Sequence, residues 1–311
     1  MVKKIKFYNN FKVKQIHKSS IILIGNFDGL HFGHQKLFNL AKKYKKKFKL
    51  KIGVITFEPM PKMYFNKNLK NFRISSAFQK KNKLEKIGID FLITKKFNKR
   101  FSKIKSKSFI KEILYKKLKA KYIFVSNNFR FGNKREGDVN ELINNEKNYN
   151  YKIVKPKPFK LKNKIISSTL IRKLLSNGKI GTVNKLLNRN WNIISKVQKG
   201  RQLGKRIGFP TCNMDIKDYV LAKPGVYAVK IYRKNNNFPL KGIANLGYRP
   251  TFNQKKILLE VYIFNFSGNL YNKQLTIDFV NFIRKEKKFK NIKQLKKQIN
   301  LDLKIAKKKL K

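Results

Sequence analysis

The stretch IILIGNFDGLHFGHQKLF, from Ile21 to Phe38, joins an apolar run to a helical pattern through a turn. That turn holds His31 and His34, two of the three histidines in the chain, with Gly33 between them. The apolar run indicates a buried strand, and a helix that begins beyond its carboxyl end offers free N–H groups to a phosphate. Because no set of carboxylates or cysteines accompanies the histidines, the stretch predicts a phosphate contact and not a zinc site. A helix-start turn with incidental imidazoles is the alternative.

The first half of the chain alternates strand-like and helical patterns. Apolar runs at Ile52–Phe57, Phe91–Thr94 and Tyr122–Val125 follow the run Ile21–Phe27. Between Ile21–Phe27 and Ile52–Phe57, apolar residues recur at helical spacing from Leu37 to Phe48. Such alternation predicts a parallel sheet flanked by helices.

From Trp191 the pattern becomes rich in strands separated by turn residues, which predicts a small antiparallel barrel. The strand-like runs are Ile193–Val197, Val226–Tyr232, Leu240–Leu246, Ile257–Phe266 and Leu275–Ile283. A lysine-rich amphipathic helix, Ile292–Leu310, is expected to close the chain. We therefore expect two domains, 1–185 and 186–311, of which the second folds alone.

The formal net charge of +62 comes from 77 Lys and Arg against 15 Asp and Glu. Such a charge favours polyanionic partners, so a basic nucleic-acid-binding protein on this scaffold is a rival hypothesis. Lysine is spread along the whole chain, however, as in sequences biased towards A/T-rich codons, and we interpret the charge mainly as background. No apolar run approaches membrane-spanning length and Cys212 is the only cysteine, which predicts a cytoplasmic protein without a disulfide framework.

Three further segments stand at the ends of predicted strands or at a helix start. EPMP begins at Glu58, SNNFRFG begins at Ser126, and ISSTLIRKLLSNG begins at Ile166. In the third segment Ser167 and Ser168 are candidate helix caps, and capping alone would explain them. It does not explain Arg172, which we expect to point towards the same site.

GNFDGLHFGHQ, TFEPMP, VSNNFRFGNKREGD and ISSTLIR, in this order, resemble the adenylyltransferase half of the bacterial bifunctional riboflavin kinase and FAD synthetase family. The resemblance implies a Rossmann-like nucleotidyltransferase domain in which His31 and His34 are catalytic. They would contact ATP phosphates while the phosphate of FMN attacks the α-phosphorus and pyrophosphate leaves. The residues that would bind ATP or FMN are Gly25, Phe27, Asp28, Gly33, Asn128, Ser168, Thr169 and Arg172.

The chain departs from this family pattern near the second segment. Ser126 stands where a Gly is usual, and Asn127 and Asn128 stand where acidic residues are common. A riboflavin kinase with weakened or lost adenylyltransferase activity is therefore a second enzyme hypothesis.

The second half contains GRQLGKRIGFPTCNM, from Gly200 to Met214. Its glycine spacing is not that of a Walker A loop, and a glycine-rich β-turn is the plain interpretation. PTCN resembles the PTAN motif of riboflavin kinases, which implies that Thr211 and Asn213 bind Mg²⁺ and ATP phosphate through hard oxygen ligands. Cys212, in place of the usual alanine, is expected to pack as a small apolar residue. Implied contacts with ATP or flavin are Gly200, Gly204, Gly208 and Pro210.

Glu260 lies in ILLEVYIFNF, a strand pattern that is apolar on both faces, where an unpaired carboxylate is costly. An ion pair with a lysine is one explanation. The segment also resembles the LEV strand of riboflavin kinases, which implies that Glu260 is the catalytic base for the riboflavin 5′-hydroxyl.

ANLGYRPTF and FIRKEKKF extend the kinase resemblance, which implies nucleotide or flavin contacts for Asn245, Arg284 and Glu286. Asn188, Asn190 and Ser195 replace the usual Gly, Pro and Gly, and we expect them to reduce stability without loss of chemistry.

The whole pattern predicts an enzyme that makes FMN from riboflavin and ATP, and then FAD from FMN and ATP, with Mg²⁺. Its partners would be these small molecules, with no specific nucleic acid and no membrane. The sequence leaves a homo-oligomer open.

Overall fold

The computed structural model describes residues 5–69, 71–161, 164–200, 203–216, 218–234, 236, 238–251 and 254–311. The chain forms two compact units. The first comprises Met1–Leu69 and Ala77–Ile166, and the second comprises Lys70–Ser76 and Ser167–Lys311. In the described part of the chain, no helix is both long enough and apolar enough to cross a membrane.

The division between the units differs from the predicted boundary at residues 185 and 186. Residues 167–185 belong to the same compact unit as the barrel strands. One reason is that the helix Ile180–Leu187 buries Ile180, Val183 and Leu187 and packs on two of those strands. The limits of the two functional domains remain a prediction.

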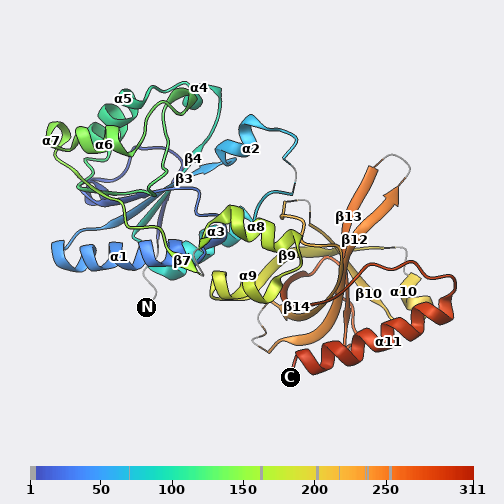
Figure 1. The fold of residues 1–311 in the computed structure, drawn as a ribbon. Coiled ribbons are helices and arrows are strands. Elements are labelled where there is room, and N and C mark those ends of the chain that lie inside the picture. The colour runs from blue at the N-terminus through green and yellow to red at the C-terminus, as the bar shows by residue number, and fades with distance from the viewer. Residues whose placement is uncertain are drawn as a thin grey trace. The chain divides into compact units, whose positions relative to one another are not determined.

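The first unit contains a parallel sheet and the helices around it (Figure 1). Its strands are β1 (Lys6–Tyr8), β2 (Ile21–Ile24), β3 (Ile52–Glu58), β4 (Phe91–Lys96), β5 (Tyr122–Phe124) and β6 (Lys152–Val154), followed by the short pair β7 (Lys160–Leu161) and β8 (Lys164–Ile165). Its helices are η1 (Gln15–His17), η2 (Asp28–Leu30), α1 (Phe32–Phe48), α2 (Pro61–Phe65), α3 (Ala77–Ile87), α4 (Lys99–Ser102), α5 (Ser106–Ser108), η3 (Phe109–Lys117), η4 (Asn133–Arg135), α6 (Val139–Asn144) and α7 (Glu146–Tyr149).

The order of the sheet is β1-β4-β3-β2-β5-β6, and all neighbouring strands run parallel. Helices α1 and α3 supply Leu37, Phe38 and Leu84 to the apolar cluster on one face of the sheet. The segment η3 and helix α6 supply buried residues to the cluster on the other face. The predicted parallel sheet flanked by helices is confirmed.

Local differences from the sequence-based expectation lie mainly in short strands. The first run ends as a strand at Ile24 and not at Phe27, because Phe27 has φ +47° and starts the turn η2. The strands β1 and β6 were not predicted, since three-residue segments such as KFY and KIV carry too little periodicity.

The second unit is a closed barrel with helices α8 (Ser168–Ser176), α9 (Ile180–Leu187), α10 (Leu203–Arg206) and α11 (Ile292–Lys309). Its strands are β9 (Trp191–Gln198), β10 (Thr211–Asp215), β11 (Gly225–Arg233), β12 (Leu240–Thr251), β13 (Gln254–Ile263) and β14 (Gln274–Lys285). The order around the barrel is β10-β13-β12-β11-β14-β9, with antiparallel neighbours.

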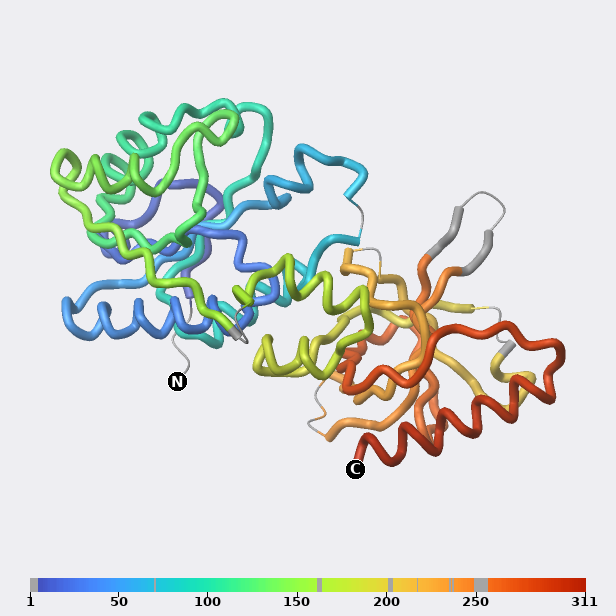
Figure 2. Tube along the Cα trace, viewed as in Figure 1, coloured from blue at the N-terminus to red at the C-terminus, as the bar shows by residue number. Residues whose placement is uncertain are grey.

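The barrel, its antiparallel strands and the final helix are confirmed. Helix α11 runs along the outside of the barrel (Figures 1 and 2). Its Ala306 packs in one apolar cluster with Val226 and Ile243. Sequence reasoning missed β10, because it treated the glycine-rich stretch before it and the PTCN motif as one loop.

Candidate functional sites

The predicted kinase residues form a row across the barrel. In the antiparallel register Asn213 of β10 stands opposite Glu260 of β13, and Glu260 stands opposite Asn245 of β12. Asn245 is in turn opposite Val226, which is opposite Arg284 of β14. Directly opposed residues share a face of an antiparallel sheet. The row therefore lies on the outer face that α11 partly covers, because Val226 packs with Ala306 of that helix.

Asn213 carries an unsatisfied oxygen in this row. The residue is 7% exposed, and among the described residues its Oδ1 has no hydrogen-bond partner. Gly200 packs directly over it, since a Cβ at Gly200 would lie 1.8 Å from Asn213 Nδ2. Buried polar atoms are nearly always paired, so an orphaned oxygen indicates a missing ligand or water.

Thr211 shares the face of β10 with Asn213, because the two residues are separated by one position in a strand. A hydroxyl and an amide oxygen fit Mg²⁺, which prefers oxygen ligands and binds through few protein groups together with water and phosphate. The described residues contain no cluster of three His, Cys, Asp or Glu side chains that could hold a metal ion. The hydroxyl of Thr211 and the amide oxygen of Asn213 suit a magnesium ion that also binds nucleotide phosphate and water.

Glu260, in this row, has a second carboxylate, Glu286, as an electrostatic neighbour. Burial raises the pKa of Glu286, Arg284 lowers it, and the charge of Glu260 raises it again. Glu286 rests against β12 at Gly247, where a Cβ would lie 1.9 Å from Glu286 Oε1. The half-buried Glu260 therefore has a second carboxylate as an electrostatic neighbour, an arrangement that favours proton uptake by one of the pair.

Arg284 is engaged by the final helix. Its Nε donates to both carboxylate oxygens of Asp302, at 2.9 and 3.0 Å, and its Nη2 donates to Oδ2 at 2.8 Å. Asp302 is 1% exposed. This bidentate pair attaches α11 to β14. A contact between Arg284 and a nucleotide or flavin remains a prediction.

The glycine-rich segment before β10 forms a tight turn. Gly208 has φ +88°, and the N–H of Phe209 donates to the carbonyl of Gly204 at 2.8 Å. A Cβ at Gly204 would lie 2.4 Å from the carbonyl oxygen of Phe209. The turn leads through Pro210 into β10, where the half-buried Cys212 faces Val261 and burial raises the pKa of its thiol.

In the first unit, the chain segments that follow β2 and β5 leave neighbouring strands at the same edge. Strand β2 has β3 as its neighbour on one side and β5 as its neighbour on the other. The strand order reverses here, so a topological switch point lies between β2 and β5. Ligands of open parallel sheets bind at such points. The segment with His31 and His34 follows β2, and the segment with Asn128 follows β5.

The two histidines stack on each other at the start of α1. His31 is the N-cap of the helix, and its ring centroid lies 3.7 Å from that of His34 with 21° between the planes. Gly33 makes room for this arrangement, because a Cβ there would lie 3.3 Å from atoms of the His31 ring. The helix start thus presents two imidazoles side by side.

His34 is held in its neutral form. Burial, and secondly the neighbouring His31, hold the pKa of His34 well below its ordinary value. Its Nδ1 is buried without a hydrogen-bond partner among the described residues. Phe27 meets the ring edge-on with centroids 5.2 Å apart, and Gly25 lets the Phe27 ring approach, since a Cβ there would lie 3.1 Å from it. Asp28 is also buried, at 4% exposed.

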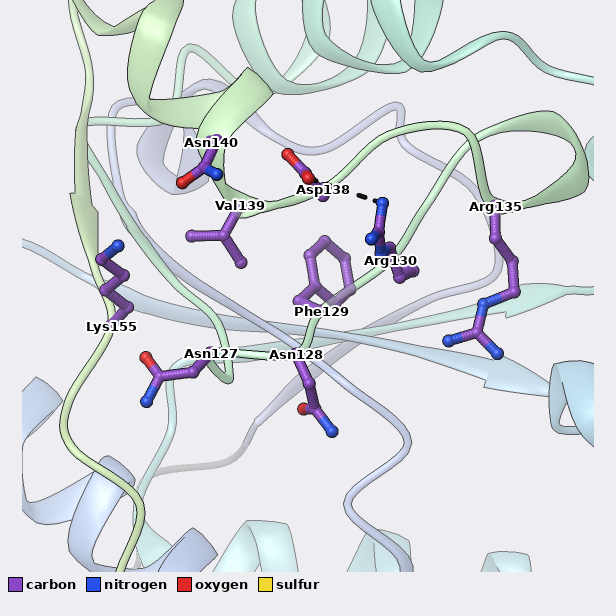
Figure 3. A pocket seen from close by; sticks show the side chains of 9 residues that line it. All are labelled: Asn127, Asn128, Phe129, Arg130, Arg135, Asp138, Val139, Asn140 and Lys155. Atoms are coloured by element: carbon purple, nitrogen blue, oxygen red, sulfur yellow. Dashed lines mark ion pairs between the residues drawn. The ribbon is translucent and has the colours of Figure 1, made fainter.

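Asn128 lines a pocket of about 380 Å³ in the first unit (Figure 3). Ser126 Oγ donates to Asn128 Oδ1 at 3.0 Å. Cations supply much of the polar lining, and Arg130 pairs with Asp138 at 3.4 Å. The lining residues are Asn127, Asn128, Phe129, Arg130, Arg135, Asp138, Val139, Asn140 and Lys155.

The remaining residues that the sequence predicts for the adenylyltransferase site lie in the second unit, on α8. Ser167 caps this helix by accepting from the N–H of Leu170 at 3.2 Å, which confirms one expected cap. Ser168 is the first helical residue and Thr169 follows it. Arg172 stacks on the ring of Phe72. Convergence of these residues with His31 and His34 remains a prediction.

The departures from the family pattern near the barrel have local explanations. Asn188 ends α9 with φ +54°, a left-handed conformation that Gly adopts freely and Asn tolerates better than most residues. Asn190 accepts from Asn184 at 3.0 Å. Ser195 pairs with Leu275 within the regular ladder of β9 and β14.

Sequence reasoning missed several polar residues near these sites. Lys80 is 5% exposed, donates to Thr56 Oγ1 at 3.0 Å and lies 4.0 Å from Glu58 at the carboxyl end of β3. No signal marks one buried lysine in a chain so rich in lysine. Arg130 lay within a quoted motif, and its position between two phenylalanines could have suggested a pocket wall.

A family model for FAD synthetase matches residues 13–170, and a model for riboflavin kinase matches residues 187–310. A curated protein from Buchnera aphidicola subsp. Acyrthosiphon pisum (strain APS), named bifunctional riboflavin kinase/FMN adenylyltransferase, is 39% identical over 95% of both chains. Proteins with the same name from Haemophilus influenzae and Escherichia coli K12 are 34% and 33% identical. These matches cover 95% and 91% of this chain, and 97% and 90% of theirs.

A crystal structure described as a macrolide-efflux protein from Streptococcus pneumoniae aligns with a TM-score of 0.84 at 27% identity, covering 97% of this chain and 98% of that one. The two family models divide the chain between them, and the curated relatives align over nearly its full length. The chain therefore belongs to the bifunctional riboflavin kinase/FMN adenylyltransferase family.

Proposed function

We propose that the barrel phosphorylates riboflavin with ATP to give FMN, and that the nucleotidyltransferase part of the chain transfers AMP from ATP to FMN to give FAD. The row of Asn213, Glu260 and Asn245 across three neighbouring strands carries this proposal. It gathers an oxygen without a partner, a carboxylate and an amide on one face, which a structural role alone does not require.

In the kinase reaction Glu260 accepts the proton of the riboflavin 5′-hydroxyl as its oxygen attacks the γ-phosphorus of ATP, and ADP leaves. Thr211 and Asn213 would hold Mg²⁺, which screens the phosphate charge. Glu286 is an electrostatic neighbour of Glu260 and supports the base from beside it. Asn245, directly opposite Glu260, is placed to orient the flavin or the nucleotide.

In the adenylyltransferase reaction a phosphate oxygen of FMN attacks the α-phosphorus of ATP, and pyrophosphate leaves. The attacking group is already an anion, so the protein needs no covalent nucleophile. His31 and His34 stabilise the charge that develops on the phosphorus oxygens, and the neutral His34 can do so by donating from Nε2. Ser168, Thr169 and Arg172 hold the nucleotide. We place both reactions in the cytoplasm because both consume ATP.

The test is incubation of the full chain with riboflavin, ATP and Mg²⁺, followed by chromatographic separation of riboflavin, FMN and FAD. We expect FMN to form first and FAD to follow. A matched incubation with FMN in place of riboflavin isolates the second reaction, and EDTA in place of Mg²⁺ tests the metal. Absence of FMN from a folded chain would contradict the proposal.

A second candidate is a kinase that has lost the adenylyltransferase reaction. One observation favours it, because the Ser126 hydroxyl donates to the side chain of Asn128, a residue that the family resemblance assigns to ATP or FMN binding. FMN formation without any FAD from supplied FMN would select this candidate. Tight oligonucleotide binding without any flavin turnover would instead select a nucleic-acid-binding protein.

A further inference from the structure

The side chain of Arg172 contacts Phe72, a residue that lies 100 positions earlier in the sequence. Its Nε donates to the carbonyl of Phe72 at 2.8 Å, and the guanidinium carbon lies 3.7 Å from the centroid of the Phe72 ring. Both residues belong to the second compact unit and both are partly buried. Hydrogen bond and stacking act on the same guanidinium, so together they define its position and its plane.

The backbone around Phe72 is anchored on both sides. Asn71 donates from Nδ2 to the carbonyl of Ile216 at 3.1 Å. The N–H of Arg73 donates to the backbone carbonyl of Asp218 at 3.2 Å, and the carbonyl of Arg73 accepts from the N–H of Val220 at 2.7 Å. Phe72 thus lies between residues that are fixed to the segment before β11. These hydrogen bonds hold the backbone on both sides of the Phe72 carbonyl that accepts from Arg172.

We propose that Phe72 is a positioning residue for the adenylyltransferase reaction, which orients Arg172 for the triphosphate of ATP. This inference rests on the proposed role of Arg172. The chemistry supports it, since an arginine has several flexible bonds and gains most from being ordered before the anion binds.

The test compares Phe72→Leu, which keeps an apolar side chain and the carbonyl but removes the aromatic face, with Phe72→Tyr, which keeps that face. We expect Phe72→Leu to lower kcat/KM for ATP in FAD formation roughly tenfold, mainly through KM, and to leave FMN formation unchanged. Phe72→Tyr should retain the wild-type values. Phe266→Leu is the matched control, because Phe266 also stacks under an arginine, Arg233, in the same unit.

Arg172→Gln separates this inference from the proposed function. If Arg172→Gln forms FAD normally, the role of Arg172 in the proposed function fails. If it loses FAD formation while Phe72→Leu does not, the role of Phe72 is overturned and that of Arg172 stands. We expect Phe72→Leu to add no further loss in the Arg172→Gln background. An equal loss of FMN and FAD formation in Phe72→Leu, with a lower Tm, would make Phe72 a structural residue and would also overturn the inference.

Discussion

Trp191 Nε1 donates a hydrogen bond to the carbonyl of Ile74 at 2.9 Å, across 117 positions of the sequence. Trp191 is 1% exposed and Ile74 is fully buried. The first residue of the barrel's first strand therefore depends on a segment from the early part of the chain. A fragment of residues 186–311 would lack this contact.

We predict that a fragment of residues 186–311 is markedly less stable than the barrel unit within the full chain. The fragment loses the partner of the Trp191 indole N–H, and a buried unpaired donor costs about 1–3 kcal/mol. It also loses Ile180 and Val183, which are buried residues of α9. Urea unfolding followed by the fluorescence of Trp191, the single tryptophan, measures the difference directly. An unchanged midpoint would contradict the structural dependence.

Glu260→Gln should lower FMN formation by roughly a hundredfold or more, in line with general-base contributions. The substitution keeps the shape of a residue that lies directly opposite Asn213 and Asn245 but removes its basicity. FAD formation from supplied FMN should be nearly unchanged and serves as the internal control. A wild-type kinase rate together with a lowered Tm would show that Glu260 has a structural role only.

Gly247→Ala should lower kinase activity about tenfold or more, because a shift of about 1 Å at a reacting group can have effects of this size. The new Cβ would lie 1.9 Å from Glu286 Oε1, so the carboxylate must leave its present position. Gly181→Ala is the matched control, since a Cβ there meets nothing within 4 Å. Alanine also favours the helical conformation more than glycine does, so the substitution should not destabilise α9. Steady-state kinetics of FMN formation on both variants test this prediction. Equal activities would show that Glu286 does not contribute to the kinase reaction.

Gly200→Ala should raise the Mg²⁺ concentration needed for half-maximal FMN formation, roughly tenfold, as for other groups that orient metal ligands. The added methyl would lie 1.8 Å from Asn213 Nδ2 and must displace the amide. Titration of activity with Mg²⁺ tests this, and Gly181→Ala is again the control. A lowered maximal rate at an unchanged Mg²⁺ midpoint would point to ATP or flavin binding instead.

The first unit should lose stability on acidification through His34. Its folded-state pKa lies below that of about 6.5 in the unfolded chain, so the unfolded chain takes up a proton first as the pH falls. The stability is complete above about pH 6.5 and is lost as the pH falls towards the folded-state pKa. Denaturant unfolding by circular dichroism at a series of pH values should show this loss in the wild type and a smaller one in His34→Asn. Identical pH profiles would show that His34 does not contribute.

Periodicity and turn residues determined much of the architecture. The alternation of apolar runs and helical spacing predicted the parallel sheet, and the Ser167 cap and Gly178 marked the limits of α8. These features depend on neighbours a few residues away, which the sequence displays directly. The segments that follow strands β2 and β5 leave the sheet at one edge, because parallel strands end together.

Only the tertiary structure decided which residues meet. The opposition of Glu260 with Asn213 and Asn245 depends on strand register, and a shift by one residue would turn each side chain to the other face. The contact between Arg172 and Phe72 joins residues 100 positions apart, and no local sequence pattern predicts it. The sequence by itself determined the elements and their motifs, since local propensity and apolar spacing are sums over near neighbours. The sites were decided by long-range pairing and burial, which arise only when distant segments pack together.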